Sequence, residues 1–170
     1  MKWVLPILVS LMLASGCGTL AAGQVDRSWS GDLPRSAIEQ LPDPNVSQPA
    51  GFRLLYGKVE TAEAWRPIAA ALAGSRFADS EGLPEVDWRS EVIVYVAFDG
   101  ATQRLGWSKL RTSVGRPPVV ELTAQPTRRP EAADGPCSGV FQVIPRDSES
   151  VGLELQRGTD RVKLATLAID

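Results

Sequence analysis

The chain contains no histidine. Without an imidazole the chain cannot form a Ser-His-Asp triad or a Cys-His pair and has no histidine ligand for zinc. It also lacks histidine as a general base, the role in which enzymes use it most often. This absence excludes many hydrolase mechanisms. We therefore expect a protein that is not an enzyme, with no catalytic residues, no metal site and no cofactor.

Cysteine is nearly as scarce, since the 170 residues include only Cys17 and Cys137. If Cys17 is modified, as argued below, no second thiol remains for an intramolecular disulfide. Cys137 then either pairs between chains or lies buried as a small hydrophobic residue, and we favour burial. A bridge between the two would require that Cys17 be neither modified nor removed.

The chain also has no excess of positive charge. Its 18 basic and 20 acidic residues nearly balance, for a net charge of -2. A nucleic-acid partner would require a clustered basic face, which the sequence does not indicate. We therefore expect no nucleic-acid binding.

What the N-terminus does contain is the pattern of an export signal. Met1 and Lys2 form a short positive segment, which residues 3–13 follow as an apolar run. This run of about eleven residues is too short for a transmembrane helix, which needs roughly 20. Residues 14–16 are small and directly precede Cys17. An extended backbone of small residues fits the narrow site of a signal peptidase.

The segment before Cys17 resembles the lipobox of bacterial lipoproteins, in which the cysteine thiol takes a diacylglyceryl group before cleavage. It departs from the commonest pattern at Ala14, where leucine is usual. We expect residues 1–16 to be a lipoprotein signal peptide and Cys17 to carry acyl chains such as palmitate, which together hold a protein on a membrane. Gly18 stands where an aspartate favours inner-membrane retention, which indicates the outer membrane. The alternative is an ordinary signal peptide cut near Ala21.

The next segment, residues 17–50, is interpreted as the lipidated N-terminus and a flexible, proline-rich tether. A flexible chain of this length has a root-mean-square span of roughly 30 Å, enough to lift a domain clear of the lipid headgroups. Only residues 35–41 have the composition of a short helical turn. Trp29 is expected to be a loosely held surface residue.

The globular domain is predicted over residues 51–170. Thr61 is expected to cap a helix over residues 62–73, whose apolar side chains repeat at three- and four-residue steps. Pro67 lies inside this segment, so either the regular helix starts there or its first turns are kinked. Gly74 is expected to end the helix.

The remaining apolar segments are predicted strands. The strongest is 92–98, a continuous apolar run typical of a strand buried on both faces. Residues 151–155 and 161–169 alternate in polarity and are joined through Gly158, which predicts a hairpin. The fold class is therefore α+β, a mostly antiparallel, β-rich single domain with one main helix. The other predicted strands are 52–56 ended by Gly57, 105–112, 119–124 after a break at Pro117 and Pro118, and 139–144, and residues 125–136 are predicted to form a loop.

Residues 65–146 resemble the C-terminal domain family of the protease-complex subunit PrcB. The resemblance is carried by the helix bearing Trp65, the acidic-aromatic step at residues 83–88, the strand that follows it, and Gly106-Trp107. The chain departs from the family where Leu105-Gly106-Trp107 lacks a doubled glycine and where Cys137 replaces an aromatic residue. The resemblance implies a small β-rich module without catalytic machinery, associated with a protease or another protein.

Four residues are candidates for a binding surface: Trp107, Lys109, Arg128 and Arg129. Trp is enriched at interface anchors, although core packing is an equal alternative for Trp107. Paired arginines can grip an acidic partner, although Arg128 and Arg129 are also consistent with ordinary soluble surface. Lys109 is otherwise read, with Arg111, as part of a solvated strand face.

Glu85 and Asp87 are spaced as a carboxylate pair, but we favour a structural role in which Asp87 or Ser90 anchors the turn before the 92–98 strand. Our leading hypothesis is a non-catalytic envelope lipoprotein that binds another protein, such as a protease or an assembly component. The alternatives are a small-ligand or cell-wall glycan binder that uses Trp107 and the 125–136 loop, and an enzyme that works with carboxylates alone.

Overall fold

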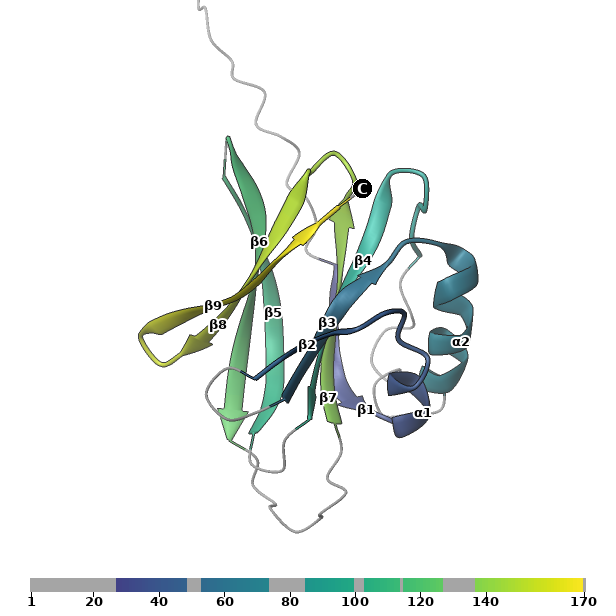
Figure 1. The fold of residues 1–170 in the computed structure, drawn as a ribbon, viewed down its shortest axis with the longest axis horizontal. Coiled ribbons are helices and arrows are strands. Elements are labelled where there is room, and N and C mark those ends of the chain that lie inside the picture. The colour runs from purple at the N-terminus through teal and green to yellow at the C-terminus, as the bar shows by residue number, and fades with distance from the viewer. Residues whose placement is uncertain are drawn as a thin grey trace, which may run out of the picture.

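The computed structural model describes residues 27–48, 53–73, 85–99, 103–113, 115–126 and 137–169. These residues form three layers, in which one β-sheet lies between a second sheet and a pair of helices (Figure 1). The prediction of a mostly antiparallel, β-rich α+β fold is confirmed.

The central layer, sheet A, consists of β1 (Ser28–Leu33), β2 (Asn45–Ser47), β3 (Arg53–Val59), β4 (Glu91–Asp99) and β7 (Cys137–Pro145). They are antiparallel and lie in the order β1-β7-β4-β3-β2. The strand that was predicted to be buried on both faces, now β4, is the middle strand of the sheet.

Sheet B consists of β5 (Gln103–Ser113), β6 (Arg116–Pro126), β8 (Ser150–Arg157) and β9 (Asp160–Ala168), in the order β5-β6-β8-β9. Strands β6 and β8 are parallel, and the other neighbours are antiparallel. The predicted terminal hairpin is confirmed as β8–β9. Gly158 in its turn has φ +61°, a left-handed conformation that glycine adopts without steric cost.

The third layer consists of α1 (Arg35–Ile38) and α2 (Ala62–Leu72), both on the side of sheet A that faces away from sheet B (Figure 1). Thr61 caps α2 as predicted, since its Oγ1 accepts a hydrogen bond from the Ala64 amide at 3.2 Å. Helix α2 starts at Ala62 and continues through Pro67, so the alternative that the helix begins at the proline is wrong.

Strand β4 shows why a continuous apolar run is needed at the centre of three layers. None of its residues from Val92 to Phe98 exposes more than 2% of its surface. Successive side chains of a strand point to opposite faces. Val92, Val94, Val96 and Phe98 pack toward sheet B, while Ile93, Tyr95 and Ala97 pack toward the helices.

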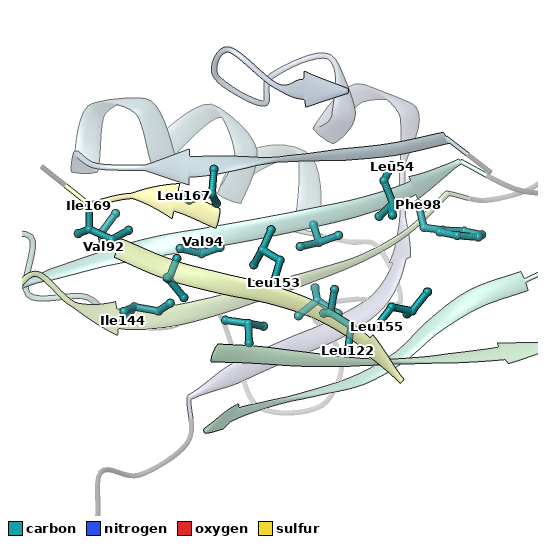
Figure 2. Close-up of a cluster of buried hydrophobic side chains, with 14 residues drawn as sticks. Leu54, Val92, Val94, Phe98, Leu122, Ile144, Leu153, Leu155, Leu167 and Ile169 are labelled. Carbon is teal, nitrogen blue, oxygen red and sulfur yellow. The ribbon is translucent and has the colours of Figure 1, made fainter. Parts of the chain in front are cut away.

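Two hydrophobic cores result. The inter-sheet core joins the facing sides of sheets A and B (Figure 2). The helix-side core joins the other face of sheet A to α1 and α2, and within it Trp65 meets Phe141 edge to face with ring centroids 5.3 Å apart. Figure 2 labels ten of the inter-sheet residues, namely Leu54, Val92, Val94, Phe98, Leu122, Ile144, Leu153, Leu155, Leu167 and Ile169.

The predicted tether over residues 17–50 is wrong for the part that the structure describes. Strand β1 pairs along its whole length with β7, and β2 pairs with β3. Trp29, expected at a loosely held surface, lies half-buried in β1 against the helix-side core. The prolines that suggested a tether instead separate short elements of the folded domain, so the domain begins no later than Arg27 and not at Gly51.

Two smaller predictions also need correction. Pro117 and Pro118 lie inside β6 and do not break the chain, because they fall at a register shift between Arg111 and Ser113 of β5 and before β6 begins to pair with β8. A proline is tolerated there because the ladder is already interrupted. Strand β3 does not end at Gly57 but continues to Val59, and β6 extends through Gln125 and Pro126 into the predicted loop.

Candidate binding surface on sheet B

The outer face of sheet B is the face that points away from the inter-sheet core. Its positions alternate with core residues such as Leu110, Leu122 and Leu153. Both helices lie on the far side of sheet A (Figure 1), where they pack in the helix-side core. We define the outer face of sheet B by six charged residues: Lys109, Arg111, Glu121, Glu154, Arg161 and Lys163.

Four of these residues form one row across the four strands. Lys109 of β5 is the register partner of Glu121 in β6, Glu121 is the partner of Glu154 in β8, and Glu154 is the partner of Lys163 in β9. Opposite charges at such cross-strand positions stabilise a sheet, whereas like charges side by side destabilise it. The two central carboxylates therefore need neutralisation from outside the row.

That neutralisation comes from two arginines that reach over an intervening strand. Arg111 of β5 bonds to Glu154 with its Nη2 2.8 Å from Oε2. Arg161 of β9 approaches Glu121 in the opposite direction, with Nη2 3.6 Å from Oε1. The first ion pair passes over β6 and the second passes over β8, so the two pairs cross. Glu121 is only 7% exposed. The two ion pairs thus hold the central carboxylates of the row and both arginines in place.

Of the four residues predicted to form a binding surface, the structure describes the side chain of Lys109 alone. Lys109 is exposed on the outer face of sheet B. Trp107 lies in β5 at a register shift between Leu105 and Ser108, and its side chain is outside the described part. Arg128 and Arg129 follow β6 in the sequence and lie outside the described residues, as does Cys17.

Sequence reasoning missed Glu121, Glu154, Arg161 and Lys163. The sequence indicated a solvated strand face only for Lys109 and Arg111. The row could not be found, because it depends on which strands are neighbours and in which register. The parallel pairing of β6 with β8 is a non-local contact that no local pattern encodes.

A second group of charged residues lies at the end of sheet A where β1 begins. Arg27 forms an ion pair with Glu91, and its Nη1 donates to the Glu85 carbonyl at 2.9 Å. Arg146 donates to the backbone carbonyls of Glu91 and Glu60. Arg27, just before β1, is thus joined to the start of β4, and Arg146, just after β7, is joined to the start of β4 and the end of β3. This group therefore holds strand ends of sheet A together.

The predicted structural role of Asp87 is confirmed. Its carboxylate accepts hydrogen bonds from Ser90 Oγ at 2.7 Å and from the Arg89 amide at 3.2 Å. These two bonds, the one from Ser90 first, hold the pKa of Asp87 below its ordinary value of 3.8. The carboxylate therefore anchors the turn that leads into β4 and is fully engaged there.

Replacing Ser90 by alanine is expected to raise the pKa of Asp87 toward 3.8, because the largest stabiliser of the charged form is lost. A lowered folded-state pKa contributes stability above the unfolded-state value and loses it as the pH falls through the folded-state value. The difference in unfolding free energy between the two proteins should therefore vanish in acid. A carboxyl-carbon NMR titration measures the pKa, with Ser36→Ala as the control; an unchanged Asp87 titration in Ser90→Ala would contradict the assignment.

The described residues hold no metal site or membrane-spanning helix, and Cys137 has a structural environment. In the described part of the chain, no group of three or more cysteine, aspartate and glutamate residues is placed to hold a metal ion. No helix there has the length and apolar character needed to cross a membrane. Cys137 is half-buried against the helix-side core, consistent with its interpretation as a small hydrophobic residue.

Comparisons of the chain with known proteins gave no match to a family model, to a curated protein or to a solved structure.

Proposed function

We propose that this protein is a lipid-anchored lipoprotein of the bacterial outer membrane whose domain binds another envelope protein and does not catalyse a reaction. The observation that carries the binding function is the outer face of sheet B. It is the sheet face that points away from the inter-sheet core, and two crossed ion pairs hold four of its six charged side chains in place. Rigid, pre-ordered charges bind a partner with less loss of conformational entropy than mobile ones.

The lipid anchor is supported by the N-terminal sequence. A charged start, an apolar run and small residues lead to Cys17, and acyl chains on that sulfur would provide a stable attachment. Because β1 draws the chain into the fold at Arg27, only ten residue steps separate the anchor from the domain. They span at most about 35 Å, so the domain is kept close to the lipid headgroups.

A non-catalytic role is supported by the state of the carboxylates. Glu154, Glu121 and Glu91 each face an arginine, and Asp87 is bound within its own turn. Carboxylates paired in this way stabilise the fold and are not free to act as a general acid or base. The resemblance to the PrcB C-terminal domain family points in the same direction, toward an accessory module associated with a protease or another protein.

Attachment is tested by membrane fractionation of cells together with mass spectrometry of the mature N-terminus. We expect the wild-type protein in the outer-membrane fraction, with a mature chain that begins at an acylated Cys17. Cys17→Ala should abolish acylation. A wild-type mature chain that begins after residue 17 and stays in the soluble extract would overturn the lipid anchor.

Binding is tested by photo-crosslinking in intact cells. Thr166 is exposed on the outer face of sheet B, next to Gly152 in register, so a photoreactive residue there should capture the partner. Ala70 is exposed on α2, on the opposite side of the molecule, and serves as the control. We expect a discrete crosslinked protein from position 166 and none from position 70. The same pattern from both, or none from either, would count against the proposal.

The alternative function, binding of a small ligand or cell-wall glycan, predicts a different result. Cell-wall fragments or sugars added to the purified protein should then quench its tryptophan fluorescence in a saturable manner. Saturable quenching without any protein crosslink from position 166 would favour this alternative.

A further inference from the structure

We infer that the outer face of sheet B binds an acidic, extended segment of the protein partner, with Lys109 and Lys163 as the two residues that contact its carboxylates. The inference rests on the proposed function and deepens it by naming the chemistry of the partner.

The outer face of sheet B is complementary in charge to an acidic segment. The outer face of sheet B carries four basic and two acidic side chains, although the complete chain has more acidic than basic residues, 20 against 18. Positive charge is therefore concentrated on a face of a chain that is acidic as a whole. Such a patch attracts negatively charged partners and suppresses binding of positive ones.

Two of the four basic residues on this face are open to a ligand. Arg111 and Arg161 are used within the face, since they neutralise Glu154 and Glu121. Lys109 and Lys163 are both exposed, and neither forms an ion pair with another residue in the described ranges. The crossed arginines cancel the acidic centre of the row, so the two lysines at its ends supply the net positive charge.

The distance between the two lysines suits an extended peptide. Lys109 and Lys163 stand at the ends of the row, three inter-strand distances apart, which is about 14 Å between their backbones. An extended peptide covers this distance in about four residues. An acidic segment that runs across the strands would thus place one carboxylate at each lysine.

The sheet register sets the distance between the backbones of Lys109 and Lys163, and such a set spacing favours a protein partner over a bilayer. Anionic headgroups are mobile and attract basic residues without regard to their spacing. A set spacing between two lysines gives no advantage on such a surface, whereas it gives a peptide a defined register. Binding to anionic lipid is therefore treated as a contrary outcome of the test below.

The test uses the full mature chain in detergent and a fluorescein-labelled polyglutamate peptide of about ten residues as the probe. Fluorescence anisotropy gives the affinity at about 20 mM salt and again at about 150 mM salt. The test variant is Lys109→Glu with Lys163→Glu. A second variant, Lys109→Gln with Lys163→Gln, removes the charges without adding new ones. The control is Arg66→Glu, a change of an exposed basic residue on α2.

We expect polyglutamate to bind the wild-type protein, more weakly at the higher salt, and to bind the double Glu variant at least about tenfold more weakly. The double Gln variant should fall between them, and Arg66→Glu should stay within about twofold of the wild type. Equal binding by all four proteins would overturn the inference, as would equal losses in Arg66→Glu and the double variants.

A lipid surface is distinguished by repeating the measurement with phosphatidylglycerol vesicles. Lysine-dependent binding to vesicles without binding to polyglutamate would overturn the inference in favour of the membrane. The proposed function fails separately, through absent or non-specific crosslinks in cells. Persistent crosslinks from position 166 with unchanged polyglutamate binding would reject only the acidic partner.

Discussion

A chain that begins at Gly51 is expected to be unfolded under conditions in which a chain that begins at Arg27 folds cooperatively. The shorter chain lacks β1, α1 and β2. Strand β1 covers β7 from Ser28 to Leu33, and the segment after it contributes Ala37 and Leu41 to the helix-side core. A true tether could be removed without effect, so the two chains separate the two interpretations of this segment.

The expected loss is large in energetic terms. Leu33 and Leu41 are 4% and 7% exposed, and each fully buried leucine contributes about 1.5–3 kcal/mol. Deletion would also leave β7 without its β1 partner from Cys137 to Gln142 and remove the ion pair between Arg27 and Glu91. Together these losses are comparable to the whole stability of a typical domain, about 5–15 kcal/mol.

Urea unfolding followed by far- and near-UV circular dichroism measures the difference. The chain that begins at Arg27 serves as the control, because it retains every described element. A cooperative transition of similar midpoint in the chain that begins at Gly51 would show that the N-terminal segment does not stabilise the domain.

Gly57→Ala is expected to destabilise the protein by about 2–4 kcal/mol. A Cβ at this position would lie 2.7 Å from Cζ of Tyr95 and closer still to its hydroxyl. The Tyr95 ring cannot move aside without losing contacts. Its hydroxyl donates a hydrogen bond to the Pro42 carbonyl at 2.6 Å, and the ring lies against Phe141. Burial, with a smaller effect of Asp43, raises the pKa of Tyr95, so the hydroxyl remains a donor at neutral pH.

The matched control for this prediction is Gly152→Ala. Its added Cβ would meet no atom nearer than 3.3 Å, the distance to a Val119 methyl group, so its effect should stay within about 1 kcal/mol. Equilibrium urea unfolding of both variants gives the comparison. Equal stability of Gly57→Ala and the wild type would mean that Tyr95 does not occupy the space next to the glycine.

Local patterns predicted the elements that local physics determines. The apolar run at β4, the Thr61 cap of α2 and the alternation of the β8–β9 hairpin are each specified by neighbouring residues. For such segments the periodicity of the side chains already states which faces are buried. The fold class followed from counting them.

The N-terminal segment was misread because its prolines and polar residues have the composition of a linker. Strand β1 contains Ser, Gly and Asp and shows no strong strand pattern of its own. It is a strand because β7 offers it an open edge, and its last residue, Leu33, packs closely over Gly139 of β7. That edge exists only after the sheet has formed.

The sequence by itself therefore determined the secondary structure of the strongly periodic segments, the excess of strands over helices, and the exposed position of Lys109. Only the tertiary structure decided that β1 belongs to the domain, and that Lys109, Glu121, Glu154 and Lys163 stand in one row. The physical reason is the same in both cases. Which strands become neighbours, and in what register, is set by long-range burial of whole sheet faces, and the residues that meet there carry no local mark of their partners.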